Sequence, residues 1–404
     1  MNDLEEFDIE DGVLIKYKGS GGDVVIPKGV TAIEDCAFMW SSRITSVTIP
    51  EGVKSIGAYA FERCNRLTRI ELPQSLISIG SGAFSKCINL VHFNTPSSLS
   101  DANVGYWVFD ECDRLADANN GLIIIGDVIY YCSRNAKTVR LPNHVKTIHS
   151  YSFQHSRLES VVIPDNVTEI QPYAFFWSIY LKDVILPKHL EVIRQGAFEG
   201  CTELQRIVIP EGVTSIEEEA FSLCKRIQEL VLPQSVTSIG HKAFEDCLSL
   251  REMMIPQSVV TMPNDVFDNG VNLKSIIAPS VSVKNYADKS AKSAAIVGYF
   301  ENRRLYCDTT IATDYFYAAL EHFEEVLPRL LERDCVAGIE LYAPRKITSF
   351  NFESVFFEPA LQANARGCVA FLLEWKKKHL VSGDFWQAMA QELSQDLGCN
   401  EKQE

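Results

Sequence analysis

The sequence predicts an α/β solenoid with a parallel β-sheet, followed by a small helical C-terminal domain. Three observations lead to this fold class. A proline recurs every 22 or 23 residues, with a single interval of 46, and such a period is typical of stacked coils that cannot bury their apolar faces alone. Apolar and polar residues alternate before each proline, which is strand periodicity. The period disappears after about residue 298. The recurring prolines are Pro27, Pro50, Pro73, Pro96, Pro142, Pro164, Pro187, Pro210, Pro233, Pro256 and Pro279.

One repeat shows how each coil is built. The unit around Pro210 has apolar residues at Ile207 and Ile209 before the proline and Ala220-Phe221 after it. Proline ends the strand because it has no N–H to donate to the ladder. The chain then turns around the far side of the coil, and the phenylalanine fills the interior. Each coil buries roughly seven apolar side chains, worth about 1.5–3 kcal/mol each before entropy is subtracted.

Half of the twelve cysteines occupy one position of the repeat, three residues after a phenylalanine. A repeating column in a solenoid is a core position, which small buried cysteines suit. We expect free buried thiols and hence a reducing compartment. Strained disulfides or a metal site are the alternatives, although no Cys-x-x-Cys pair supports zinc. The six residues are Cys64, Cys87, Cys112, Cys201, Cys224 and Cys247.

The repeat has a consensus, Leu-x-x-Val-x-Ile-Pro-x-x-Val-x-x-Ile-x-x-x-Ala-Phe-x-x-Cys, that covers about residues 7–298. Its Ile-Pro and Ala-Phe landmarks keep a fixed offset, as at Ile26-Pro27 and Ala37-Phe38. This motif resembles the leucine-rich repeats of the BspA-like bacterial surface-antigen family. The resemblance implies a right-handed horseshoe with a parallel sheet. It also implies a likeness to adhesins and protein-binding surface proteins.

The repeats divide the chain into five predicted parts. Residues 1–22 form a capping hairpin around Asp11-Gly12, because an Asp-Gly pair favours a tight turn. Residues 23–119 form a first array of four coils, residues 120–141 a second hairpin around Gly126-Asp127, and residues 142–298 a second array of seven coils with a closing cap. Residues 299–404 form the helical domain. We expect the arrays to make one continuous, bent sheet, with a restart at the insertion as the alternative.

The C-terminal region shows helical spacing of apolar residues. The pattern predicts a closing helix over residues 286–293 and a strand over 295–297. Further helices are expected at 315–325, 360–379 and 385–397. The segment from Ala360 to Glu374 resembles, weakly, one ankyrin-type helix pair. A helical cap that packs on itself or on the end of the sheet is the simpler interpretation.

Strand residues that miss the core should point to the concave face of the sheet. The residue just before each apolar-proline landmark is one of these, and in the second array it is always apolar. An exposed apolar row with a polar rim is typical of a protein interface. Covering by the helical tail or a second copy, and simple strand propensity, are the alternatives. The six residues are Val162, Ile185, Val208, Val231, Met254 and Ile277.

Large aromatic residues stand at turn positions that are polar in other coils. Phe176 and Trp177 follow Ala174-Phe175, and Trp40 is the equivalent of Trp177 in the first array. These side chains could anchor a peptide or a glycan. Local packing between irregular coils is the alternative.

Composition and missing motifs exclude several functions. A formal net charge of −15 argues against nucleic acid as a partner. No apolar run is long enough for a membrane span, and the acidic N-terminus lacks the features of a secretory signal. The sequence as it stands therefore predicts a cytoplasmic protein, or a cell-surface or secreted one if a signal was removed.

We find no catalytic motif, metal-ligand set or cofactor-binding loop. His144, His149 and His189 are expected to be solvated turn residues. The sequence therefore predicts a non-catalytic scaffold that binds another protein or a peptide through the concave face of the second array, with possible self-association through the same face. The alternative is a bacterial surface adhesin for a host protein or glycan.

Overall fold

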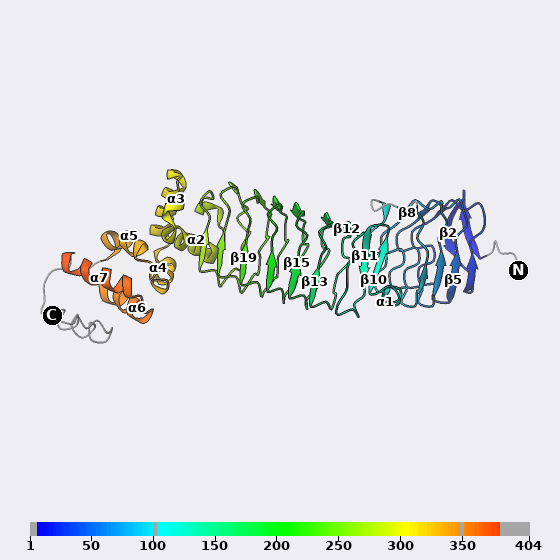
Figure 1. The fold of residues 1–404 in the computed structure, drawn as a ribbon, viewed down its shortest axis with the longest axis horizontal. Helices are drawn as coiled ribbons and strands as arrows, with labels where there is room; N and C mark the ends of the chain where they lie inside the picture. Colours follow the sequence, from blue (N-terminus) through cyan, green and yellow to red (C-terminus); the bar gives the residue numbers. More distant parts are fainter. Residues whose placement is uncertain (1–5, 98, 100–102, 348–350, 380–404) are drawn as a thin grey trace. The chain divides into compact units, whose positions relative to one another are not determined.

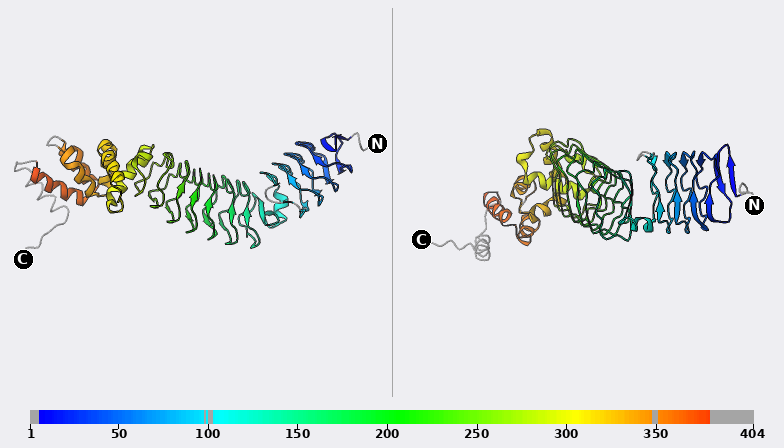
Figure 2. Two further views of the ribbon diagram at one scale, coloured as in Figure 1. Left: turned by 90° about the horizontal axis from the view of Figure 1, so that it is seen from above. Right: turned by 45° about the vertical axis from the view of Figure 1, so that its right-hand side comes forward.

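The computed structural model describes residues 6–97, 99, 103–347 and 351–379 (Figure 1). These residues form two compact units. The first comprises the described residues up to Asn272 together with Asn285–Asp288, and the second comprises Leu273–Lys284 and the described residues from Lys289 onward. The first unit contains the stacked coils, which follow one another along its length (Figure 2). The second is mainly helical.

Most coils contribute two short strands, so the first unit carries two sets of parallel ladders. The strand before the proline builds what we call the proline-side ladder. Its strands are β3 (Gly22–Val25), β5 (Ile44–Thr48), β7 (Arg69–Glu71) and β9 (His92–Phe93), then β13 (Ser160–Val162), β15 (Asp183–Ile185), β17 (Arg206–Val208), β19 (Glu229–Val231) and β21 (Glu252–Met254). The pairing is in register, for example Val161 with Val184 and Val184 with Ile207. The predicted parallel β-solenoid is confirmed.

A second strand on the far side of most coils was not predicted. It is only two residues long and usually ends in isoleucine, so its alternation is too short to recognise in the sequence. We call this set the two-residue ladder. Its strands are β4 (Ala32–Ile33), β6 (Ser55–Ile56), β8 (Ser78–Ile79), β12 (Thr147–Ile148), β14 (Glu169–Ile170), β16 (Val192–Ile193), β18 (Ser215–Ile216) and β20 (Ser238–Ile239).

Phenylalanine side chains form a continuous column inside each array. The rings of Phe198, Phe221 and Phe244 are stacked, with centroids 5.6 and 5.9 Å apart and interplanar angles of 5° and 8°. The first array repeats the arrangement at Phe38, Phe61 and Phe84. All of these rings are buried. Like side chains therefore do lie above one another, as the fixed period predicts.

The cysteine column is buried and its thiols are free. Each Sγ donates a hydrogen bond to the carbonyl of the phenylalanine 26 or 28 residues earlier, as from Cys224 to Phe198 at 3.2 Å. Ser178 holds the same position and donates to the Phe153 carbonyl at 2.6 Å. Burial raises the pKa of Cys64 and of Cys247 to about 12, so these thiols stay protonated. The six thiols of this column, all of them free, are Cys64, Cys87, Cys112, Cys201, Cys224 and Cys247.

Two hairpins begin the two arrays, and they have the same geometry. Strands β1 (Phe7–Glu10) and β2 (Val13–Tyr17) flank Asp11-Gly12, while β10 (Leu122–Ile125) and β11 (Val128–Cys132) flank Gly126-Asp127. Each residue pair of the first hairpin has its equivalent in the second hairpin 115 positions later, which is five times the 23-residue period. The two hairpins also have a bulge at the same place. Each hairpin continues into the two-residue ladder, through β2 with β4 and β11 with β12. Both hairpins therefore act as caps.

The strand pairing corrects the expectation of one continuous sheet. The first proline-side ladder ends at β9, which pairs with β7, and the hairpin opens a separate ladder, ordered β10-β11-β12-β14. A short helix, α1 (Asp113–Asp117), and the hairpin occupy the place of a regular coil. The sheet therefore restarts at the insertion, because a second cap is placed where the next strand would pair.

The turns after the two-residue ladder have an unusual backbone. Many coils have two residues in the left-handed region four positions apart, for example Tyr173 (φ 59°) with Trp177 (φ 52°) and Gly196 (φ 55°) with Gly200 (φ 72°). Glycine adopts this conformation without strain, whereas other residues reach it at a small cost. Trp40, Trp107 and Tyr151 stand at left-handed positions as well.

The second unit begins with β22 (Ser275–Ile277), covered by α2 (Lys289–Glu301). This 13-residue helix corrects the expected closing helix over 286–293 and strand over 295–297. Its alanines favour a helix, and burial from Ala291 to Phe300 explains its strand-like apolar run. A Cβ atom on Gly298 would lie 2.2 Å from the Ile276 carbonyl oxygen, so glycine permits the close packing.

Further helices follow in the second unit. They are α3 (Thr309–Glu321), α4 (Phe323–Glu332), α5 (Val336–Lys346), α6 (Glu358–Gln362) and α7 (Arg366–His379), with short turns η3 (Val283–Asn285), η4 (Arg303–Leu305) and η5 (Phe352–Phe357). The helix expected over 360–379 is divided at Asn364, which is left-handed. Asp334 accepts hydrogen bonds from the N–H groups of Gly367 and Cys368, which joins α5 to α7. The helix expected over 385–397 lies outside the described residues. The resemblance to an ankyrin-type pair stays a prediction.

Candidate protein-interaction surface

The outward face of the second proline-side ladder carries an apolar row. Val208 and Val231 are 79% and 78% exposed, whereas their strand neighbours Ile207 and Leu230 are buried. Because side chains alternate along a strand, this contrast places the row on the solvent side. At about 4.8 Å per coil, the row is roughly 19 Å long. We call it the apolar stripe; its members are Val162, Ile185, Val208, Val231 and Met254.

Ile277, the sixth residue expected in this row, has different surroundings. It lies on β22 in the second unit and is half-buried, next to the buried Ser275 and Ile276. The structure therefore groups five of the six residues on one exposed face of the first unit. Whether they bind a partner stays a prediction.

Charged side chains next to the apolar stripe pair with each other between coils. Lys182 Nζ lies 2.7 Å from Glu159 Oε2, and Arg206 Nε lies 2.9 Å from Asp183 Oδ1. Exposed pairs of this kind contribute little to stability. These side chains place two matched ion pairs beside the stripe.

The aromatic residues predicted as a second site are not all together. Trp40 lies in the first array, where the guanidinium carbon of Arg63 is 4.5 Å from its ring centroid. Phe176 and Trp177 lie in the second array, with ring centroids 6.3 Å apart. The structure therefore separates Trp40 from the other two.

Phe176 and Trp177 belong to a larger aromatic cluster that sequence reasoning missed. The ring of Tyr151 stacks on that of Tyr173, with centroids 5.3 Å apart and an interplanar angle of 6°. The ring centroids of Trp107 and Tyr151 are 4.7 Å apart. Trp107, Tyr151 and Tyr173 each stand at a left-handed turn, and this recurrence could have indicated the cluster. The spacing from Trp107 to Tyr151 departs from the 23-residue period, so the sequence pattern does not align the two rings. We define the junction aromatic patch as Tyr106, Trp107, Tyr151, Tyr173, Phe176 and Trp177.

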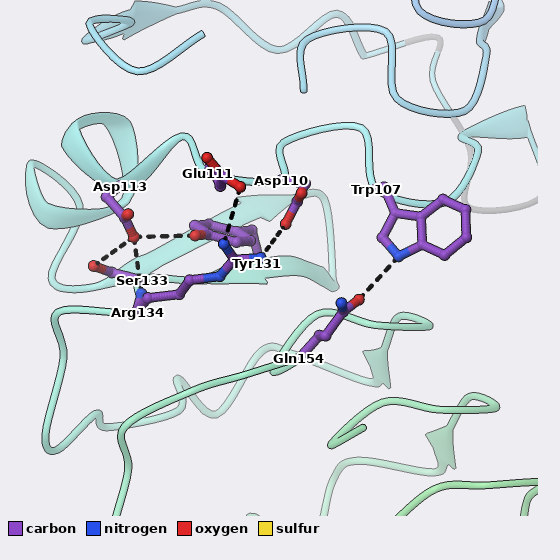
Figure 3. Close-up of polar contacts among 8 residues, drawn as sticks. All are labelled: Trp107, Asp110, Glu111, Asp113, Tyr131, Ser133, Arg134 and Gln154. Carbon is purple, nitrogen blue, oxygen red and sulfur yellow. Dashed lines mark hydrogen bonds and ion pairs between the residues drawn. The ribbon is translucent and has the colours of Figure 1, made fainter. Parts of the chain in front are cut away.

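A polar network joins the last coil of the first array to the second hairpin (Figure 3). Arg134 Nη2 donates to Asp110 Oδ1 at 2.6 Å, and its Nη1 lies 3.3 Å from Glu111. Asp113 Oδ1 accepts from the Tyr131 hydroxyl at 3.0 Å and from the Ser133 hydroxyl at 3.1 Å. Burial raises the pKa of Asp110 although Arg134 opposes the shift. The network therefore holds the second hairpin against the last coil of the first array, which carries Tyr106 and Trp107 of the aromatic patch.

Figure 3 also shows the indole of Trp107, whose Nε1 donates to Gln154 Oε1 at 3.0 Å. This bond crosses from the last coil of the first array to the first coil of the second. It satisfies the polar end of the indole and leaves the ring face for contacts with Tyr151. The orientation of Trp107 is thereby set by two separate contacts.

Two hollows lie at the same junction, with volumes of about 620 and 320 Å³. Both are lined by Phe93, Leu115 and Asn119. Neither hollow includes a residue of the apolar stripe or of the aromatic patch. They mark the gap that the restarted sheet leaves beside β9.

Within the described ranges, no group of three or more His, Cys, Asp or Glu side chains is arranged to hold a metal ion. Of the helices in the same ranges, none has the length and apolar character needed to cross a membrane. His149 corrects a prediction: it is 3% exposed rather than solvated, and its ring lies 4.7 Å from that of Tyr130.

The stacked coils, buried columns and capping hairpins define a repeat protein of the β-solenoid class. A family model for the BspA type leucine rich repeat region matches residues 16–119, 67–182, 108–226 and 170–294. The chain therefore belongs to the BspA-type leucine-rich repeat family, which confirms the resemblance seen in the repeat motif.

Three solved structures of bacterial proteins are similar to part of the chain. A leucine-rich repeat protein from Bacteroides ovatus is 20% identical, with 69% of this chain and 88% of that chain covered and a TM-score of 0.44. A leucine rich cell surface protein from Faecalibacterium prausnitzii is 21% identical, with 69% and 91% covered and a TM-score of 0.31. The pneumococcal vaccine antigen PcpA is 20% identical, with 68% and 83% covered and a TM-score of 0.38. No curated protein matches the chain.

Proposed function

We propose that this protein is a non-catalytic scaffold that binds another protein or a peptide through the apolar stripe. The observation that carries this proposal is the exposure of five apolar side chains in one row, while their strand neighbours are buried. Burying such a row would contribute about 25 cal/mol per Å² of apolar surface removed from water. Membership in a leucine-rich repeat family supports the same class of function.

The stripe fits an extended or flat apolar partner surface. Its side chains are aligned by the parallel register of β13, β15 and β17, and the ion pairs beside it keep its edge polar. An apolar centre with a polar rim matches the arrangement of many protein interfaces. Another protein and a second copy of this chain both meet this requirement.

The test compares two variants of the full chain with the wild type. Val208→Asp combined with Val231→Asp places two charges in the stripe, and Val25→Asp places one at the same ladder position in the first array, where the valine is 68% exposed. A phage-displayed peptide library is selected on each protein, and sedimentation velocity reports self-association. We expect the double variant to lose the peptides or the self-association of the wild type, and Val25→Asp to retain them.

Folding serves as the control in this test. All three valines point into solvent, so circular dichroism should be unchanged and stability should fall by no more than about 1 kcal/mol. Unfolding of the double variant would show that these residues belong to the core. Equal binding by all variants would exclude the stripe as the binding surface.

A bacterial surface adhesin is the second candidate function. It is supported by the family and by the description of the Faecalibacterium prausnitzii structure as a cell surface protein. Limited proteolysis of intact producing cells separates the two: an adhesin would be cleaved from the outside, and an internal scaffold would be protected until the cells are lysed.

A further inference from the structure

The junction aromatic patch lies on the turn side of the coils, away from the apolar stripe in the repeat. Tyr106, Trp107 and Trp177 are 49%, 39% and 39% exposed. Tyr151 and Tyr173 are half-buried between them, and Phe176 meets Tyr173 edge-on at 5.8 Å. Aromatic surface exposed over three successive coils is more than isolated surface residues provide. The patch is therefore a candidate binding surface, independent of the proposed function.

Carboxylates border one end of the patch. A Cβ atom built on Gly196 would meet both the Tyr173 ring and Glu199 Oε2, at 2.2 and 3.2 Å, so this carboxylate stands beside the ring. Burial and the neighbouring Glu219 and Glu245 raise the pKa of Glu199 to about 7. Among the described residues, Lys242 pairs with Glu245 at 3.3 Å, whereas no Lys, Arg or His nitrogen lies within 4 Å of Glu199. A cation supplied from outside would relieve this repulsion.

The molecule itself shows what an indole at this position binds. Trp40 and Trp177 occupy the same place in the repeat, each directly after the residue that follows the buried phenylalanine. In the first array the residue 23 positions later is Arg63, whose guanidinium lies over the Trp40 ring at 4.5 Å. In the second array the residue 23 positions later is Gly200, which has no side chain to offer. Trp177 therefore offers an indole for a cation–π contact as Trp40 does, but the residue at the position of Arg63 supplies no cation.

We propose that the junction aromatic patch binds an arginine side chain of an extended segment of a partner protein. The guanidinium would lie against the rings of Trp177 and Tyr173 and pair with the carboxylate of Glu199. Arginine suits such a site because its planar cation stacks on aromatic rings and binds carboxylates with two donors. The neighbouring rings of Tyr151 and Trp107 would contact the residues that flank the arginine.

The probe is an end-capped hexa-arginine peptide, titrated into the full chain by isothermal calorimetry at low and moderate salt. Two variants remove different parts of the site: Trp177→Ala removes the ring and Glu199→Gln removes the charge. Two matched controls keep the site intact: Trp40→Ala removes the equivalent indole of the first array, and Glu211→Gln removes an exposed carboxylate elsewhere. Circular dichroism checks that each variant is folded.

We expect Kd to rise about tenfold in Trp177→Ala and in Glu199→Gln, which is the order of a cation–π contact or a charge-assisted pair. The controls, and the Val208→Asp/Val231→Asp variant of the stripe, should change Kd by less than about twofold. The stripe variant makes failure of this proposal distinguishable from failure of the proposed function.

Three outcomes would overturn the proposal. The first is no binding of hexa-arginine to the wild type. The second is equal binding by all variants, which would indicate general attraction to an acidic protein. The third is Trp177-dependent binding of neutral maltohexaose without binding of hexa-arginine, which would assign the patch to glycans instead.

Discussion

In the first array the outward residue two positions before the proline is polar at Thr48, Glu71 and Asn94 and apolar at Val25, whereas in the second array it is apolar from Val162 to Met254. The polar residues are engaged within the array: Glu71 accepts from Arg69 at 2.6 Å, and the Asn94 side chain bonds the backbone of Leu72. The apolar ones have no such bonds to make. The same ladder position therefore carries mostly polar side chains in the first array and a row of exposed apolar side chains in the second.

The interiors of the two arrays do not differ in this way. Both contain a stacked phenylalanine column and buried cysteines that donate to a phenylalanine carbonyl, as at Cys87 and Cys224. Each interior side chain packs against the equivalent side chains of the coils before and after it, so a substitution there changes the packing of both neighbouring coils. Outward positions have no such constraint, so binding surfaces can differ between arrays that share a fold.

The largest expected effect tests whether the interiors are equivalent. Phe61→Ala in the first array and Phe221→Ala in the second should each lower the free energy of unfolding by about 3–5 kcal/mol, because a buried ring between two others is lost and leaves a cavity. Urea unfolding followed by circular dichroism measures both. A loss below about 1 kcal/mol in one array only would show that its column is not close-packed.

A smaller effect is expected at the junction between the arrays. Arg134→Met should cost about 1–3 kcal/mol, because it leaves the partly buried carboxylate of Asp110 without its cation. Adding Asp110→Asn should restore part of this loss. Arg114→Met is the control, since the Arg114 side chain is exposed and donates a hydrogen bond to Asn89 rather than to a carboxylate. Thermal unfolding of the wild type, Arg134→Met, Asp110→Asn and the double variant gives the coupling energy of the pair. Additive losses would show that the pair does not stabilise the junction.

The smallest expected effect depends on pH and concerns the second array. Because the pKa of Glu199 is raised from 4.5 to about 7, the folded chain holds a proton there that the unfolded chain releases. Stability from this group is therefore present below about pH 4.5 and lost as the pH rises to about 7. The titratable groups that face it are Tyr151, Tyr173, Cys201, Glu219 and Glu245.

Glu199→Gln mimics the protonated carboxyl, so its effect should change with pH. We expect it to match the wild type near pH 5 and to raise Tm by roughly 2 °C near pH 8. Glu211→Gln should show no such dependence, because Glu211 is exposed. Thermal melts over this range provide the measurement. The same gain at both pH values would contradict the raised pKa.

Some features could be predicted from individual residues and others could not. The proline period and the Ala-Phe landmarks indicated the coils, the buried columns and the exposed side of Val208 and Val231. The two-residue ladder was missed because two residues are too few to show alternation. The run Ala295-Ile296-Val297 has the pattern of a buried strand, because a helix buried on all sides has no amphipathic pattern. Its cover, β22, lies beside it only in the folded unit.

The sequence by itself determined the stacking. A fixed period places equal side chains one above another, and only that register buries all of the apolar ones. It also determined which face of each strand points outward, because strand residues alternate. Only the tertiary structure decided where the sheet restarts, that Trp107 meets Tyr151 across the insertion, and that Trp40 lies apart from Trp177. These depend on contacts between coils of unequal length, where the period no longer specifies the distance between side chains.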